Sequence, residues 1–170
     1  MKILLKLKHW QLFPLLILTL FISNFTWVGF ELLNTLLTLT GFLIYMIWYF
    51  VIGMELTEYL PNKIVLGRTI FIINGFVLLV STMVLVIFFD GSYSTNSFIG
   101  FVWIVYLIYA IFQFFMFPAK VLKTIELKRE ATLGDYLWCF LLMIFWPAGV
   151  WWIQPKLNRI IKEVKAEEVV

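Results

Sequence analysis

Four polar side chains close together in the sequence could form a small binding site. Residues separated by three, four and seven positions share one face of a helix, and this spacing relates Glu31, Asn34, Thr35 and Thr38. A carboxylate beside an amide and two hydroxyls can line a polar vestibule that opens to water at the outer end of a helix. The same residue types also hydrogen-bond neighbouring helices to one another, and we favour this second role.

A second candidate is the sequence Trp146-Pro147-Ala148-Gly149, which interrupts the apolar segment 136–153. Proline has no backbone N–H, and glycine permits a sharp turn, so we predict a helix break at Trp146, Pro147 and Gly149. Irregular backbone inside a membrane is tolerated only against protein or a water-filled cavity. The break is therefore the candidate gate if this chain forms a channel.

The other residues that could do chemistry are isolated in the sequence. Glu55 and Glu58 lie three positions apart, but no nearby histidine or cysteine would complete a metal site, and we interpret them as solvated charges at a helix end. His9, the single histidine, is expected to anchor the chain at the level of the lipid headgroups. Cys139, the single cysteine, lies in an apolar run and is expected to be a core filler. We assign no catalytic residue, metal ligand or cofactor.

The amino-acid composition indicates whether water or lipid surrounds the helices that position these residues. The chain has 170 residues, of which 63% are hydrophobic, 19% aromatic and only 14% charged. A soluble domain is typically about 45–50% apolar and about 25% charged. So much apolar surface requires lipid as part of the solvent. We predict an all-α integral membrane protein that forms a single membrane domain over residues 1–170. The net charge of +3 is better explained by membrane topology than by nucleic-acid binding.

The apolar segments predict four crossings of the bilayer. The run from Trp10 to Met54 is far too long for one crossing, so it must fold back near Gly29-Phe30-Glu31. No small-residue cleavage site follows the basic N-terminus, so we expect an uncleaved first helix. The predicted membrane helices cover about 10–29, 33–54, 69–89 and 97–117, and Pro118 is expected to end the last of them. A short amphipathic surface helix is predicted over about 119–130.

The basic residues indicate which ends of these helices share a membrane face. All 13 lysines and arginines fall before the first helix, between the second and third, after the fourth, or in the tail 154–170. Cytoplasmic loops carry such an excess, so both termini are expected in the cytoplasm. Basic groups on both sides of 136–153 favour a re-entrant or interfacial segment there. The alternative is a fifth crossing that places the C-terminus outside.

Polar residues inside the predicted helices are few. Asn74, Ser81, Thr82 and Gln113 are expected to hydrogen-bond between helices. The helix cores contain no ionisable residue, which argues against a proton relay.

In the tail, an apolar stripe could rest on the membrane or on a partner; it comprises Leu157, Ile160, Ile161 and Val164. The spacing of Thr132 and Asp135 predicts a helix start there.

Three stretches carry a resemblance: Lys6 to Gln11, Ala119 to Glu126, and Phe145 to Arg159 with its sequence FWPAGVWWIQPKLNR. Together they resemble a group of small, uncharacterised multi-pass bacterial membrane proteins. The resemblance implies a bacterial inner (cytoplasmic) membrane location, and no activity or functional residue comes with it.

The function that these observations favour is a non-enzymatic accessory or scaffold subunit that acts through helix–helix contacts. The expected partners are the lipid bilayer and a membrane protein or further copies of this chain, with no nucleic acid. One alternative is a small oligomeric channel or transporter gated at the Trp146–Gly149 break. A second is a membrane enzyme that uses interfacial carboxylates such as Glu55 or Asp135.

Overall fold

The computed structural model describes residues 7–61, 64–89, 92, 94 and 97–167, and the elements in these ranges are all helical. They are α2 (His9–Asn24), α3 (Glu31–Glu55), the 3-10 helix η1 (Leu56–Tyr59), α4 (Thr69–Phe89), α5 (Phe98–Leu127), α6 (Leu133–Ile144) and α7 (Trp146–Glu167). Three helical stretches are long and apolar enough to cross a membrane: Glu31–Tyr59, Thr69–Phe89 and Phe98–Leu127. The prediction of an all-α, membrane-embedded protein is confirmed.

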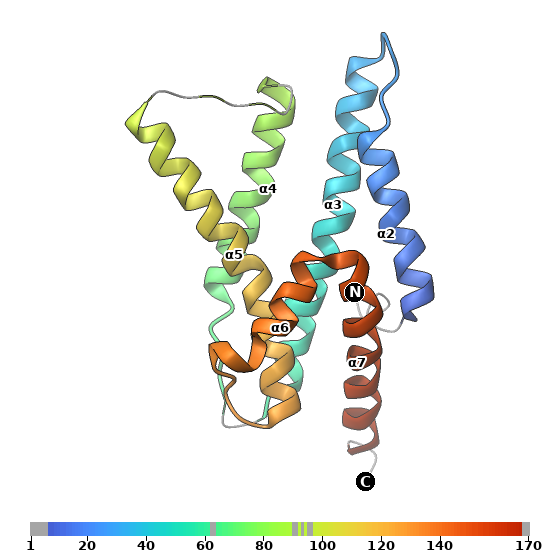
Figure 1. Ribbon diagram of the computed structural model, residues 1–170, viewed down its shortest axis with the longest axis vertical. Coiled ribbons are helices and arrows are strands. Elements are labelled where there is room, and N and C mark those ends of the chain that lie inside the picture. The colour runs from blue at the N-terminus through green and yellow to red at the C-terminus, as the bar shows by residue number, and fades with distance from the viewer. Residues whose placement is uncertain (1–6, 62–63, 90–91, 93, 95–96, 168–170) are drawn as a thin grey trace.

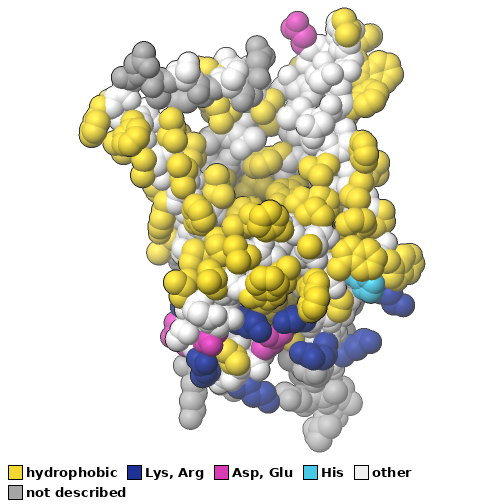
Figure 2. All heavy atoms as spheres, viewed as in Figure 1, with side chains coloured by type: hydrophobic (Ala, Val, Ile, Leu, Met, Phe, Trp, Pro, Cys, Tyr) yellow, Lys and Arg dark blue, Asp and Glu magenta, His cyan; other side chains and the backbone are white. Residues whose placement is uncertain are grey.

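Two helical pairs make up the body of the molecule (Figure 1). α2 and α3 lie side by side, α4 and α5 form the second pair, and α6 and α7 pack where the pairs converge. On the face in Figure 2, hydrophobic side chains form a broad band and lysines and arginines gather below it. We call this lower end, where α5 and α7 finish, the basic end, and the end where α2 turns into α3 the far end.

The first helix is shorter than predicted. It ends at Asn24 rather than near residue 29, because the side chains of Ser23 and Asn24 hydrogen-bond back to the Leu20 carbonyl and the chain then turns. Gly29 adopts a φ of 84°, a conformation that glycine reaches without strain. α3 begins at Glu31, so the predicted point of folding back is confirmed. With 16 residues, α2 is about 24 Å long.

A cluster of aromatic rings forms the core where the helical pairs converge. Trp48 and Tyr49 of α3, Phe71 of α4 and Phe114 of α5 are each at most 2% exposed. The rings of Phe71 and Phe114 stack at a centroid distance of 5.2 Å. This shared aromatic packing joins the two helical pairs.

The predicted helix end at Pro118 is wrong, and so is the separate surface helix over 119–130. α5 continues through Pro118 to Leu127. Pro118 has no N–H, so the helix loses one hydrogen bond, to the carbonyl four residues earlier. The side chains of the following turn are buried, and their packing keeps this part of the chain helical. Ala119, Val121 and Leu122 are fully buried against the rest of the protein. The residues that suggested a face on the membrane surface instead pack inside the fold.

The C-terminal segment forms two helices instead of one apolar segment and a tail. α6 begins at Leu133, where the Thr132 N–H donates to the Asp135 carboxylate over 2.8 Å, so the predicted helix start is confirmed. α7 continues past the predicted boundary at residue 153 to Glu167. The predicted role of the tail stripe is wrong for the three members whose side chains are described. Leu157, Ile160 and Ile161 are at most 7% exposed and pack in the protein's own core.

Candidate functional site

The two C-terminal helices meet at the predicted break. Phe145 ends α6 with φ −88° and ψ 59°, outside the helical region, and α7 starts at Trp146. In Figure 1, α6 rises from the basic end and α7 runs back toward it. The two helices pack against each other as a hairpin. Its tip is the sequence that was singled out as a candidate gate.

The hairpin tip depends on a tyrosine from α3. In a continuous helix the N–H of residue 147 would donate to the carbonyl of Met143, but Pro147 has no N–H. The hydroxyl of Tyr49 takes its place and donates to the Met143 carbonyl over 2.7 Å. The hydroxyl oxygens of Tyr45 and Tyr49 are 3.0 Å apart. α3 therefore satisfies the carbonyl that the proline leaves without its helical partner.

Gly149 allows the first turn of α7 to lie against the end of α6. Its N–H donates to the Phe145 carbonyl over 2.9 Å. A Cβ atom at this position would lie 1.9 Å from the carbonyl oxygen of Leu142, which no ordinary contact allows. The glycine is needed for this close approach of two backbones.

Trp146, the first residue of the predicted break, packs inside the protein. It is 8% exposed and contacts Phe13 and Tyr45, each at a ring-centroid distance of 6.3 Å. Trp151 is 48% exposed and covers His9 at 4.8 Å. The tip thus has a structural role, and its role as a gate stays a prediction.

The described parts of the three stretches that carried the resemblance meet around α7. The carbonyl of Leu7 accepts hydrogen bonds from the side-chain amides of Gln154, at 2.8 Å, and Asn158, at 3.1 Å. Glu126, from the second stretch, pairs with Lys156 of the third at 3.3 Å. Segments that are far apart in the sequence therefore converge near the basic end, which the sequence could not show.

The predicted polar face on α3 lies at the far end, where two of its four residues hold the turn together. Asn34 bonds both the N–H and the carbonyl of Trp27, at 2.8 and 3.0 Å, and the Thr38 hydroxyl donates to the Ser23 carbonyl over 3.0 Å. Glu31 is exposed in the first turn of α3, and Thr35 is half-buried. Thr38 thus has the helix-to-helix role that we favoured, Asn34 binds the turn between the helices instead, and a ligand site on this face stays a prediction.

The interfacial carboxylate of Asp135 is poorly suited to acid–base catalysis. The N–H of Thr132 and then the guanidinium of Arg129, 3.0 Å away, lower the pKa of Asp135 to about 2. A general acid or base works best with a pKa near the operating pH. Glu55 ends α3 as predicted and is half-buried, with one carboxylate oxygen buried, so its carboxylate is solvated only in part. Among the described residues, no three His, Cys, Asp or Glu side chains are grouped to hold a metal ion.

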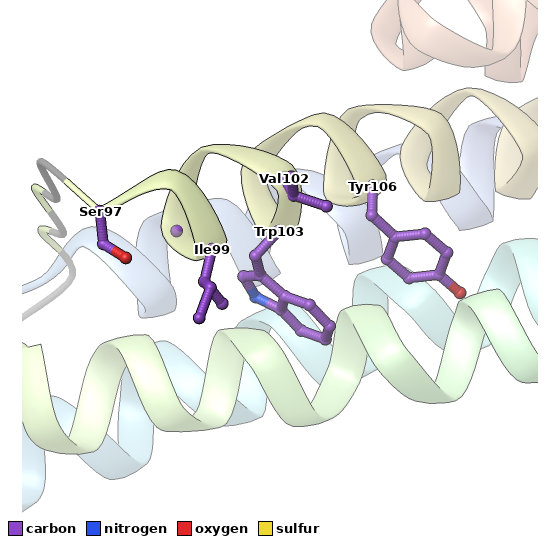
Figure 3. A pocket seen from close by; sticks show the side chains of 6 residues that line it. Ser97, Ile99, Val102, Trp103 and Tyr106 are labelled. Carbon is purple, nitrogen blue, oxygen red and sulfur yellow. The ribbon is translucent and has the colours of Figure 1, made fainter.

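A crevice between α4 and α5 is the feature that sequence reasoning missed. The hydroxyl of Tyr106 donates to Asn74 over 3.0 Å, which confirms the predicted interhelical role of Asn74. Beyond this bond the two helices diverge toward the far end (Figure 1). The space between them forms a cavity of about 660 Å³ lined by Val80, Ser81, Val84, Leu85, Phe89, Trp103, Ile104 and Leu107. The α5 side chains Ile99, Trp103 and Tyr106 point toward α4 (Figure 3).

The far half of α5 has little protein around it. Residues 97–105 are all exposed except Gly100, so within the described part of the chain this stretch has little packed against it apart from α4. Phe98 and Ile99 are 79% exposed and Phe101 is 62% exposed. The sequence gives no sign of this, because the residues are apolar without a periodic polar face. The unpacked half of α5 and the crevice beside it form one continuous apolar surface, which we call the α5 surface.

Comparisons with protein-family models, with curated proteins and with solved structures found no match to this chain.

Replacing Tyr49 by phenylalanine should destabilise the hairpin tip. The variant leaves the buried Met143 carbonyl without a donor, and such a group costs about 1–3 kcal/mol. We expect a matching loss in the free energy of unfolding of the purified protein in detergent. Tyr45→Phe is the control, because it leaves the bond between Tyr49 and Met143 in place. Equal stability of Tyr49→Phe and the wild type would show that the bond is dispensable.

Gly149→Ala should also destabilise the protein, by about 1–3 kcal/mol or more, since the added methyl group meets backbone. Gly134, in the first turn of α6, has open space where a Cβ would lie. Gly134→Ala is therefore the matched control, and we expect its stability to be unchanged or raised by up to about 1 kcal/mol. Thermal unfolding in one detergent measures both variants. Similar effects at the two glycines would contradict the close approach at Gly149.

Proposed function

We propose that this protein is a non-enzymatic accessory subunit of a bacterial inner membrane that binds a transmembrane helix of a partner protein along the α5 surface. The observation that carries this proposal is the exposure of the far half of α5 on nearly every side. Helices in lipid associate through van der Waals packing and interhelical hydrogen bonds rather than the hydrophobic effect. The far half of α5 lacks most of this packing, and a partner helix would provide it.

The chemistry of the crevice suits such a partner. Its walls are apolar, and Ser81 supplies a single hydroxyl group among them. Small hydroxyl side chains are enriched at contacts between membrane helices, where they can hydrogen-bond across the interface. Trp103, which is 46% exposed, adds a large, rigid contact area. These features support a helix as the occupant.

We also infer that the chain crosses the membrane four times. α3, α4 and α5 have the length and apolarity for crossing. α2, about 24 Å long, would be a short first crossing, which a bilayer accommodates by local thinning. The clustering of lysines and arginines at the basic end supports a cytoplasmic location for this end and for both termini.

The α6–α7 hairpin supports a re-entrant segment in this topology. α6 has 12 residues and is about 18 Å long, roughly half the thickness of the hydrocarbon core. Because α7 runs back toward the basic end, the hairpin enters and leaves on one face. A fifth crossing would instead carry α7 and its basic residues through the membrane.

Cysteine labelling should distinguish these topologies. In a Cys139→Ala background, we expect Ser94→Cys to react with a membrane-impermeant maleimide on intact spheroplasts. Lys162→Cys should react only after permeabilisation. Both parent residues are exposed in the structure, so accessibility within the fold is not limiting. Labelling of Lys162→Cys from the outside of intact spheroplasts would replace the hairpin with a fifth crossing.

Site-specific photo-crosslinking should detect the partner helix. A benzophenone amino acid at Val102, on the α5 surface, should give a protein adduct of one defined mass. The control position is Phe76 on α4, which is 64% exposed but does not line the crevice, and it should give lipid adducts alone. Filling the crevice with Ser81→Phe should reduce both the adduct and co-purification of the captured protein. Lipid adducts alone at both positions would refute the proposal.

A further inference from the structure

A single carboxylate near the basic end gathers three cations. Glu126, near the end of α5, has a side chain that is only 13% exposed. It accepts a hydrogen bond from Lys123 over 2.6 Å, and Lys156 and Arg159 of α7 lie 3.3 and 3.9 Å from it. We call these four side chains the Glu126 cluster. Within these four side chains, three positive charges face one negative charge.

Glu126 holds the lysine ammonium groups of the cluster in place, and each ammonium group still has N–H donors for a ligand. Each lysine has three N–H donors, and both lysines are held on Glu126. Lys123 and Lys156 are 22% and 31% exposed, so solvent or a ligand reaches them. Three cations around a single carboxylate also repel one another, and a second anion would relieve this repulsion. The arrangement is suited to a phosphate group, whose several oxygens accept from lysine and arginine together.

An exposed tryptophan continues the same face of α7. Trp152, Lys156 and Arg159 are related by four and seven positions, so they line one side of the helix. Trp152 is 63% exposed and lies one turn from Lys156, on the side away from the basic end. Tryptophan is enriched where hydrocarbon meets the headgroups, and basic residues there attract anionic lipids. In Figure 2 the lysines and arginines border the hydrophobic band, which is the level of a lipid headgroup.

We propose that the Glu126 cluster binds the phosphate of an anionic glycerophospholipid, whose acyl chains lie along the apolar surface beside Trp152. The site combines cations for the phosphate with an apolar surface for the chains, which a free phosphate ion would not use. The surrounding segment adds to the attraction, since residues 119–159 contain six lysines or arginines and three carboxylates. This site lies at the opposite end of α5 from the α5 surface, so it stands independently of the partner helix.

Native mass spectrometry of the full chain, released from detergent with a mixture of phosphatidylglycerol and phosphatidylcholine, tests the proposal. We expect one phosphatidylglycerol molecule to be retained in preference to phosphatidylcholine. Lys156→Ala should weaken this retention about tenfold, the loss expected for one charge-assisted hydrogen bond of about 1.4 kcal/mol. Lys162→Ala removes the same charge from an exposed position of α7 and should leave the preference unchanged.

Two further measurements distinguish lost lipid binding from lost stability, and lipid binding from binding of phosphate alone. Lys156→Gln keeps the aliphatic stem, so it should lose the preference while unfolding in phosphatidylcholine at the wild-type temperature. An excess of inorganic phosphate should displace little phosphatidylglycerol if the acyl chains contribute to binding. Equal retention of the two lipids, equal losses for Lys156→Ala and Lys162→Ala, or full displacement by inorganic phosphate would each overturn the proposal.

Discussion

The C-terminal half of this fold depends on satisfying one backbone carbonyl. Inside a membrane no water is present to accept or donate hydrogen bonds, so every backbone polar group must find a partner in the protein. Pro147 takes the helical donor away from Met143, and the Tyr49 hydroxyl replaces it over 2.7 Å. That bond lets the chain reverse direction at the hairpin tip. It also joins the hairpin to α3, the helix that contributes most to the aromatic core.

The two ends of the molecule differ in how closely their helices pack. Near the basic end, α3, α5, α6 and α7 share buried side chains, ion pairs and side-chain hydrogen bonds to backbone. Toward the far end, α4 and α5 separate once they have passed the bond between Asn74 and Tyr106. The basic end is closely packed, and the far end exposes apolar surface between and around α4 and α5. This arrangement suits a subunit whose fold is stabilised at one end and which binds a partner at the other.

The sequence predicted those features that one or two residues determine locally. Gly29 beside Glu31 marked the first reversal, the pair Thr132 and Asp135 marked the start of α6, and Pro147 marked the break. Features that depend on packing were missed. Pro118 does not end α5 because the residues after it are buried, and Trp146 is buried because α2 and α3 enclose it. In helices that are apolar on every side, no periodicity tells a protein-facing residue from a lipid-facing one. The α5 surface was therefore invisible in the sequence.

The hydrogen bonds to Leu7 have a consequence for the order of assembly during synthesis. The carbonyl of Leu7, just before α2, is bound by Gln154, 147 positions later. Contacts between such distant residues form late and slow folding. The first helix can pack on α3 as soon as α3 is made, but its Leu7 end gains the partners Gln154 and Asn158 only after α7 has been translated. The contact between α7 and the start of α2 is then a late event, in which the last of these helices to be made binds the first.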